Sequence, residues 1–236
     1  MNALLRLLAR RTSFVEDEIL GLDTLVQTGD VCIDVGAEYG LYTHALVGLV
    51  GPAGTVHSVE PLPGAYRILR AGLALTGRRN VRTYRLALGD HAEQGDLSVP
   101  WRRGLPVHGR AFLTSGANGD GPNVEFSTSR TVQVEVVTLD ELCARERIDR
   151  VDFVKADVEG AELAVLHGAE ATLVSYRPML LLEIEERHLD KYGCDATEVV
   201  HWLADRGYAM RAWRRGAWQA VSEVSAAGRN YLFVPR

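Results

Sequence analysis

The chain has 236 residues, of which 47% are apolar, and its formal net charge is −5. This length and composition fit one large domain with a full core and exclude global disorder, while the negative charge argues against a nucleic-acid partner. No apolar run reaches membrane-spanning length and the three cysteines show no paired spacing, so we expect a cytoplasmic protein without disulfides or a zinc site.

Helical segments are expected before the first strand. Residues 1–11 hold leucines that are interrupted and followed by arginines, which indicates an amphipathic arm rather than a targeting segment. Ser13 and Glu16 have the spacing of a capping box and predict a helix over the residues that follow. We assign residues 1–28 to an N-terminal helical arm that covers one mouth of a ligand site, and residues 29–236 to the main domain.

Residues 31–50 predict a strand, a sharp glycine turn and a helix. Gly36 and Gly40 lack a Cβ, so a ligand can approach the backbone closely and meet free N–H groups at the helix start. The spacing departs from the dinucleotide pattern G-x-G-x-x-G. Asp34 and Glu38 put two carboxylates where a pyrophosphate would lie. A cationic ligand fits better, and S-adenosylmethionine carries a sulfonium and an ammonium.

A second strand is expected over residues 56–60 and ends at Glu60, whose carboxylate is placed to accept hydrogen bonds from ribose hydroxyls. Pro63 then suits the first turn of a helix. A third strand over residues 80–86 leads into the loop 87–90, beside which an adenine ring would rest. Asp90 either accepts from the adenine amine or is a turn residue next to glycine.

Residues 91–132 are rich in turn formers and show no clear periodicity. We expect a loop insertion that acts as a lid or binding loop and determines acceptor specificity. Residues 132–137 then alternate as a strand, and Thr138 with Glu141 forms a second capping box.

Two further strands end in acidic residues. Residues 151–157 end at Asp157, and the apolar run 178–184 contains Glu183 near its end, with His188 just beyond. Residues 208–213 and 230–234 predict a closing pair. The predicted fold is therefore α/β: a single Rossmann-like, doubly wound sheet, mostly parallel with an antiparallel C-terminal strand, and helices on both faces. Ligands in such sheets bind beyond the carboxyl ends of the strands.

Several segments together resemble the FkbM-type methyltransferases, which are class I S-adenosylmethionine-dependent enzymes. These segments are residues 33–40, 59–63, 87–90, 137–142 and 154–162. The resemblance implies that residues 36–40 approach the methionine part of the cofactor, Glu60 the ribose and residues 87–90 the adenine. Asp157 would face both methionine and acceptor. One departure is Glu38, where the family often carries Asn.

With the strand-end argument, the resemblance predicts eleven cofactor-binding residues. They are Asp34, Gly36, Ala37, Glu38, Gly40, Glu60, Pro61, Ala87, Leu88, Asp90 and Asp157. Many members of the family act on hydroxyls of secondary metabolites or sugars. The resemblance therefore implies O-methylation of a small molecule, as in natural product biosynthesis, by in-line methyl transfer.

The proton of the acceptor hydroxyl needs a base, and three residues at or just after strand ends are candidates: Asp157, Glu183 and His188. His188 could equally be a solvated histidine in a charged turn, and His108 in the insertion is a further candidate. Asp157, Glu159 and Glu183 could instead chelate Mg²⁺, but no spacing compels this, so we favour a route without metal ligands.

Other classes of function stay open at this point. They are an N-methyltransferase, an NAD-dependent oxidoreductase and a non-catalytic nucleoside-binding protein. The sequence also leaves a homodimer open.

Overall fold

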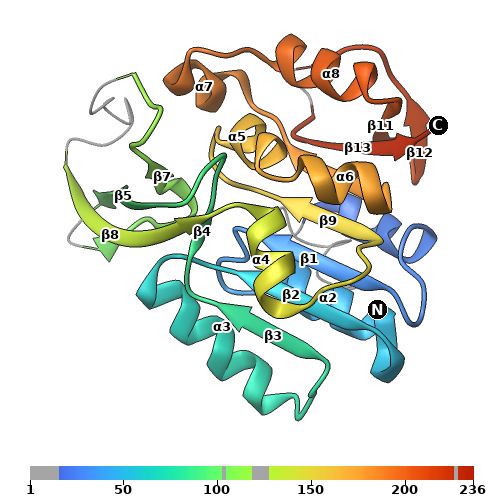
Figure 1. Ribbon diagram of the computed structural model, residues 1–236, viewed down its shortest axis with the longest axis horizontal. Helices are drawn as coiled ribbons and strands as arrows, with labels where there is room; N and C mark the ends of the chain where they lie inside the picture. The colour runs from blue at the N-terminus through green and yellow to red at the C-terminus, as the bar shows by residue number, and fades with distance from the viewer. Residues whose placement is uncertain (1–15, 103–104, 119–127, 226–227) are drawn as a thin grey trace.

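The computed structural model describes residues 16–102, 105–118, 128–225 and 228–236, in which two sheets are flanked by helices (Figure 1). The predicted arm over residues 1–11 and the cap at Ser13 lie outside the described residues. The larger sheet has eight strands in the order β12-β11-β13-β10-β9-β1-β2-β3, and the smaller one follows the order β4-β8-β5-β6 with β7 paired to β5.

The strands are β1 (Val31–Val35), β2 (Thr55–Val59), β3 (Val81–Tyr84), β4 (Ala87–Leu88), β5 (Glu93–Arg102), β6 (Leu105–Pro106), β7 (Phe112–Leu113), β8 (Ser129–Val137), β9 (Phe153–Ala156), β10 (Met179–Glu183), β11 (Tyr208–Arg214), β12 (Ala217–Ala220) and β13 (Asn230–Pro235). The α-helices are α2 (Leu41–Val50), α3 (Pro63–Leu75), α4 (Leu139–Glu146), α5 (Glu162–His167), α6 (Glu170–Tyr176), α7 (Glu186–Leu189) and α8 (Ala196–Asp205). Short 3₁₀ segments are η1 (Asp17–Thr24), η2 (Gly51–Ala53), η3 (His108–Arg110) and η4 (Asp190–Tyr192).

The strand order reverses at β1, which lies between β2 and β9 and is parallel to both. Val35, the last residue of β1, pairs in register with Val59 of β2 and Ala156 of β9. The carboxyl ends of these three strands therefore lie side by side, where open α/β sheets bind their ligands. The predicted doubly wound sheet is confirmed, and its site edge is fixed by this register.

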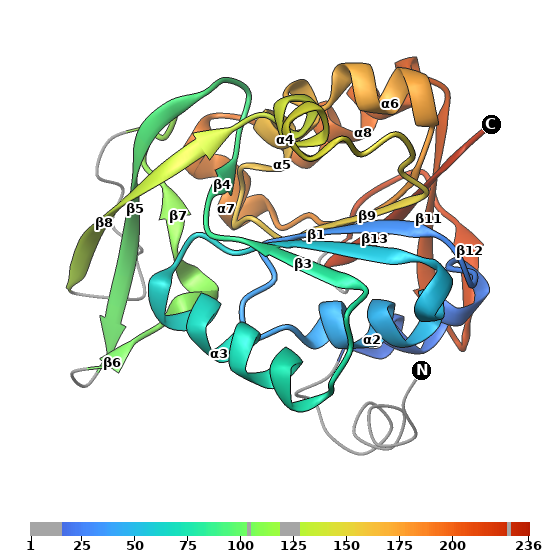
Figure 2. The same cartoon turned by 60° about the horizontal axis from the view of Figure 1, so that its bottom comes forward.

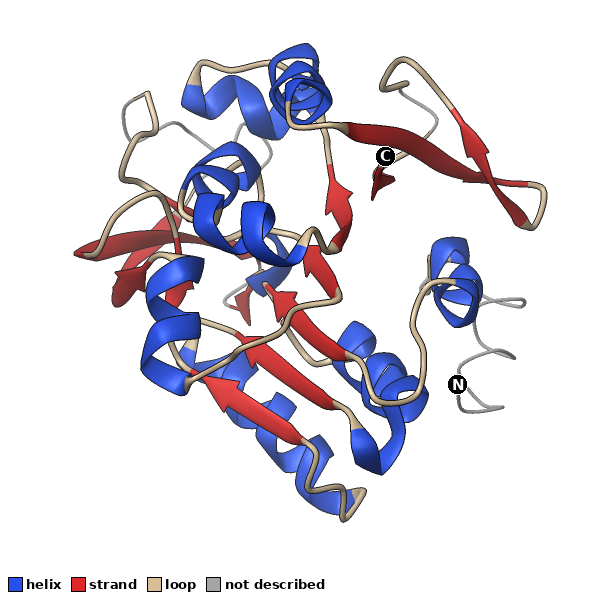
Figure 3. Cartoon of the chain, turned by 45° about the vertical axis from the view of Figure 1, so that its right-hand side comes forward, coloured by secondary structure: helices blue, strands red, loops and turns tan. Residues whose placement is uncertain are grey.

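Helices cover both faces of the large sheet because alternate residues of each strand point to opposite sides. Cys32 of β1 and Phe153 of β9 pack with residues of η1 and α2, whereas Ile33 and Val154 pack with those of α4, α5, α6 and α8. Figures 2 and 3 show these two helical layers on either side of the strands. Helix α4 begins after Thr138, as the sequence predicts, and the capping box between Thr138 and Glu141 is complete.

The C-terminal edge of the sheet is antiparallel, as predicted, but it holds more strands. β13 pairs antiparallel with β10 on one side and with β11 on the other. The segment between β11 and β13 contributes β12, which forms a hairpin with β11. This hairpin extends the sheet at the edge far from the site.

The segment 91–132 is not the aperiodic loop that we expected from the sequence. Most of its described residues form the smaller sheet, in which β5 pairs with β8 over eight residues of register. Leu97 and Val99 of β5 point inward and pack with Leu62 and Ala65 at the start of α3. The small sheet thus stands over the carboxyl ends of the large one (Figure 1).

All three cysteines are present as free thiols; Cys32 and Cys143 are buried and Cys194 is partly buried. Among the described helices, none combines the length and the apolar character that crossing a bilayer requires.

Candidate active site

A cavity of about 290 Å³ opens at the carboxyl ends of β1, β2, β9 and β10. Its floor comes from the large sheet and its cover from η3 and β7 of the small one. The lining residues are Glu16, Val35, Gly36, Glu38, Val59, Glu60, Pro61, Leu62, Ala87, Leu88, Leu97, residues 108–113, Asp157, Val158, Glu159, Ala161, Glu183 and Arg229. Seven of the predicted cofactor-binding residues therefore meet in one cavity: Gly36, Glu38, Glu60, Pro61, Ala87, Leu88 and Asp157.

Position 36 requires a glycine because the ends of β1 and β9 approach each other closely there. Its φ of +77° lies in the left-handed region, and a Cβ placed there would fall 1.8 Å from the carbonyl oxygen of Asp157. Only glycine combines this conformation with so short a backbone contact. The chain therefore turns sharply out of β1 while β9 lies directly against it, and both ends open into the cavity.

The backbone amides of the turn are used inside the protein. The N–H groups of Gly36 and Ala37 both donate to the carbonyl of Val59, each at 3.0 Å, and the Glu38 N–H donates to the Glu60 carboxylate at 2.8 Å. The expectation that this turn presents free amides to a ligand is wrong for these three positions. A bound ligand would meet side chains and carbonyl groups here rather than an amide cradle.

Glu60 is the central carboxylate of this half of the cavity. It is only 4% exposed, and its two oxygens accept hydrogen bonds from the backbone N–H groups of Glu38 and Leu62, both at 2.8 Å. Burial raises the pKa of Glu60 to about 7, although these two hydrogen bonds by themselves would lower it. Each oxygen keeps a further lone pair, so the carboxylate can accept from a hydroxyl that enters the cavity.

Four predicted cofactor residues lie outside the set of described residues that line the cavity: Asp34, Ala37, Gly40 and Asp90. The buried Asp34 accepts from the Thr43 hydroxyl at 2.5 Å, which ties β1 to α2. Gly40 has a φ of +90° and faces Leu69 of α3. Asp90 contacts His91 at 2.6 Å and lines a separate hollow.

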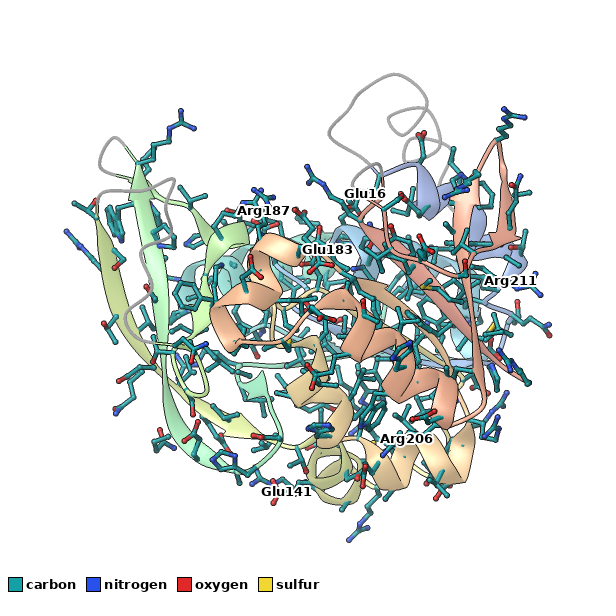
Figure 4. The ribbon with its side chains drawn as sticks, turned by 90° about the horizontal axis from the view of Figure 1, so that it is seen from above. Glu16, Glu141, Glu183, Arg187, Arg206 and Arg211 are labelled. Carbon is teal, nitrogen blue, oxygen red and sulfur yellow. The ribbon has the colours of Figure 1, made fainter. Side chains whose placement is uncertain are left out.

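The other half of the cavity holds Asp157 and Glu183. Asp157 is 34% exposed at its side chain, and its Oδ2 lies 3.8 Å from the buried ammonium of Lys155. Burial and then the neighbouring Asp157 carboxylate raise the pKa of Glu183, so this side chain is a proton donor to Asp157 at neutral pH. Figure 4 shows Glu183 at the centre of the molecule, between the two sheets.

His188 is buried beside this pair and does not line the cavity. Its Nε2 accepts a hydrogen bond from the Arg110 guanidinium at 2.7 Å and lies 3.1 Å from Oε2 of Glu159. Burial, together with Lys191, lowers the pKa of His188 to about 4. The interpretation of His188 as a solvated surface histidine is therefore wrong, and its Nε2 is already engaged by Arg110.

The cover of the cavity supplies residues that periodicity could not indicate. His108 of η3 lines the cavity and its Nδ1 lies 2.9 Å from the Tyr39 hydroxyl. Phe112 comes from the same segment, while Glu16 and Arg229 come from opposite ends of the chain. The sequence had named His108 as a further candidate base within the insertion, but nothing local shows which strands the insertion joins.

Sequence comparisons identify a family and relatives to which this chain is similar. The family model described as methyltransferase FkbM domain matches residues 34–210. The chain is 29% identical over 161 residues to 31-O-demethyl-FK506 methyltransferase FkbM of Streptomyces tacrolimicus, covering 61% of both chains. It is 24% identical over 146 residues to Methyltransferase 1 of Beauveria bassiana (strain ARSEF 2860), covering 58% of this chain and 57% of that one. The chain thus spans about three fifths of these relatives' lengths.

The fold is also found in solved structures. One is the crystal structure of methyltransferase FkbM from Methylobacillus flagellatus KT, with a TM-score of 0.55 and 14% identity over 97% of this chain and 57% of that one. At this identity the likeness concerns the fold alone. The family match covers most of the sheet and both halves of the cavity, and on that ground this chain belongs to the methyltransferase FkbM domain family.

Proposed function

We propose that this chain binds S-adenosyl-L-methionine in the cavity and methylates a hydroxyl of a small-molecule acceptor. One observation carries the proposal: Gly36, Glu60 and Asp157 line a single cavity at the point where strand order reverses. The family to which the chain belongs supports the same reaction class. The name of the Streptomyces tacrolimicus relative, which specifies a 31-O-demethyl substrate, supports oxygen as the methylated atom.

The charge of the cavity fits a cationic cofactor. Six carboxyl side chains line it, from Glu16, Glu38, Glu60, Asp157, Glu159 and Glu183, against two guanidinium groups. Burial is the main cause that raises the pKa of Glu38, Glu60 and Glu159, and neighbouring carboxylates raise it further, so compensation by positive charge would favour the ionised forms. A sulfonium and an ammonium would supply that compensation.

Each part of the cavity has a proposed role. Glu60 accepts from the ribose hydroxyls, with its carboxylate fixed by two backbone N–H groups. Ala87 and Leu88 are apolar and border the adenine. Gly36 and Glu38 border the methionine part, and the carboxylate of Glu38 there suits an ammonium better than an uncharged amide would. Asp34 and Gly40 support the turn from behind.

When bound, the cofactor supplies a methyl group that is already activated by its sulfonium. The chain then has to align the acceptor and take up one proton. Alignment of this kind contributes roughly 7–11 kcal/mol, and a base adds about 10²–10⁴-fold. Asp157 is the proposed base because it is the accessible carboxylate of the acidic half. Glu183 donates to it and so holds its orientation.

The two histidines are weaker bases in this arrangement. His188 would have to break its hydrogen bond to Arg110 before accepting a proton. His108 lines the cavity, but burial lowers its pKa and its Nδ1 already contacts Tyr39. An amine acceptor would use the same geometry, so an acceptor screen has to include amines.

The structure argues against the dinucleotide alternative. A pyrophosphate needs free N–H groups at the glycine turn, whereas those of Gly36, Ala37 and Glu38 are all engaged. The carboxylates of Glu38 and Glu60 would also repel it.

The proposal is tested by calorimetry with S-adenosylmethionine and S-adenosylhomocysteine, and by an acceptor screen read as release of S-adenosylhomocysteine. We expect micromolar affinity, about −8 kcal/mol. No heat and no thermal shift with either compound would contradict cofactor binding. Binding without turnover on any hydroxyl or amine would instead support a nucleoside-binding protein.

A further inference from the structure

We propose that Glu159, Glu183 and His188 form a binding site for a divalent first-row transition cation. Each residue offers one ligand atom, and these three atoms all lie within 4.8 Å of one another. Glu183 would bind the ion as a carboxylate, so binding would release the proton that this side chain otherwise donates to Asp157. All three side chains are buried, at 7%, 7% and 4% exposure. The sequence had favoured a site without metal, because only the fold brings His188 to the two carboxylates.

The site is assembled by close packing of two loops. Glu159 lies between β9 and α5, Glu183 ends β10, and His188 lies on α7. Gly160, with a φ of +108°, lies so near that a Cβ would fall 2.3 Å from the His188 carbonyl oxygen. Any larger residue would push the Glu159 loop away from His188.

The loop that carries Glu159 is itself held in place by a buried carboxylate. Oε1 of Glu162 accepts from the backbone N–H groups of Val158 at 3.2 Å and Gly160 at 3.3 Å. Glu162 is only 2% exposed. These two hydrogen bonds flank Glu159 in the chain and fix its direction, in the way that supporting residues orient metal ligands.

Two acceptor atoms, one on His188 and one on Glu159, lie next to each other in this cluster. Nε2 of His188 has one in-plane lone pair, and Arg110 donates to it at 2.7 Å. Oε2 of Glu159 lies 3.1 Å from the same nitrogen and, among the described residues, has no hydrogen-bond partner. Burying such an oxygen without a partner costs free energy. A metal ion can satisfy both atoms at once, whereas one guanidinium N–H cannot.

The guanidinium of Arg110 therefore occupies the position that we propose for the metal ion. Its Nη1 is 2.7 Å from His188 Nε2 and 3.6 Å from Glu159 Oε2. It comes from η3 in the cover of the cavity and not from the large sheet. In this arrangement the guanidinium and the metal ion compete for one position.

The ligand set selects the metal. One imidazole and two carboxylates suit ions such as Zn²⁺, whereas Mg²⁺ prefers oxygen ligands and retained waters. Three protein ligands leave a position open, and Glu159 and Glu183 both line the cavity. If the proposed methyl transfer holds, an acceptor hydroxyl there would become more acidic and lose its proton to Asp157.

The experiment titrates Zn²⁺ into the full chain after removal of metal with a chelator, using a chromophoric chelator as competitor. We expect one ion per chain, bound at least about 10-fold more weakly by Glu159→Gln and His188→Ala. Arg110→Gln should bind it more tightly, because the competing guanidinium is gone. His108→Asn, a histidine of the same cavity outside the cluster, is the matched control and should leave the affinity unchanged. Mg²⁺ should not displace Zn²⁺.

Two results would overturn the proposal: Zn²⁺ affinity that neither ligand variant changes, or no Zn²⁺ bound by wild type and Arg110→Gln alike. Circular dichroism identifies a variant that fails to fold. In that case the absorption spectrum of the Co²⁺-loaded wild type is the deciding measurement. A sulfur-to-cobalt charge-transfer band would show that a cysteine binds the ion and would contradict the proposed site. The measurement needs no methyl transfer, so its failure is distinct from failure of the proposed function.

Discussion

The two halves of the cavity differ in how completely their polar groups are satisfied. On the glycine-turn side, both oxygens of Glu60 accept backbone hydrogen bonds, and the amides of Gly36 and Ala37 share the Val59 carbonyl. On the acidic side, Oε2 of Glu159 lacks a hydrogen-bond partner among the described residues. Glu183 is held protonated because burial raises its pKa.

This difference separates two tasks. A half whose polar groups are already paired is preorganised and binds a ligand of fixed shape with little rearrangement. A half with buried carboxyl groups of raised pKa can exchange protons and cations, and perturbed pKa values of this kind gather at the functional sites of enzymes. We therefore assign cofactor binding to the first half and the reaction to the second, and the following experiments test that division.

The largest effect is expected from Gly36→Ala, which affects both halves at once. The new Cβ would clash with the Asp157 carbonyl in a left-handed backbone, so we expect a loss of about 3–5 kcal/mol in unfolding free energy. Urea unfolding measures it. Gly77→Ala is the control: its φ is +65° but nothing lies within 4 Å, so backbone strain alone should cost about 1–2 kcal/mol. Equal losses would show that the contact between β1 and β9 is not tight.

Asp157→Asn should affect only the acidic half. We expect turnover to fall by about 10²–10⁴-fold while cofactor affinity stays nearly constant, because the base is lost and the glycine-turn side is intact. Steady-state kinetics and calorimetry separate the two quantities. Asp90→Asn, an exposed aspartate outside the cavity, should change neither. A parallel loss of affinity and turnover would place Asp157 in cofactor binding instead.

Glu60→Gln should have the opposite pattern. Loss of a charged acceptor should weaken cofactor binding by about 1.5–3 kcal/mol, with a smaller change in turnover at saturating cofactor. Calorimetry gives the affinity directly. Should affinity stay unchanged, Glu60 would be a support for the turn through Glu38 and Leu62 and not a cofactor ligand.

The smallest effect concerns pH and Glu162. Burial raises its pKa to about 7 from the usual 4.5, so the folded state holds the proton more tightly than the unfolded state. Its contribution to stability is complete below pH 4.5 and is lost as pH rises through 7. Between pH 5 and 8, Glu162 should lower the unfolding free energy of the wild type by on the order of 1 kcal/mol. Glu162→Gln should lack this part of the pH dependence.

Thermal unfolding across that range compares the wild type with Glu162→Gln. Glu135→Gln is the control, since this carboxylate pairs with Arg145 at the surface and 47% of its side chain is exposed. Unfolding temperatures that depend on pH equally in all three proteins would show that Glu162 does not carry the effect.

The sequence predicted the strand ends well because they depend on short-range chemistry. A run of alternating apolar residues followed by a glycine turn favours a strand end at Gly36, and the acidic residues Glu60 and Asp157 mark the other two ends in a similar way. The capping box at Thr138 is likewise local and is confirmed. The small sheet escaped prediction because β5 contains Gly95 and Pro100, and its pairing with β8 joins residues up to 43 positions apart, from Glu93 to Val136.

The sequence by itself determined the fold class and the family, since both depend on the order of strands, turns and helices along the chain. Only the tertiary structure decided which side chains meet. Arg110 reaches His188 across 78 positions, and both side chains lie against Glu159. Sequence periodicity cannot predict this contact, because the contact forms only when two loops and the smaller sheet pack over one edge of the large sheet. The same packing keeps Asp34 and Gly40 out of the cavity, although they belong to the motif that marks it.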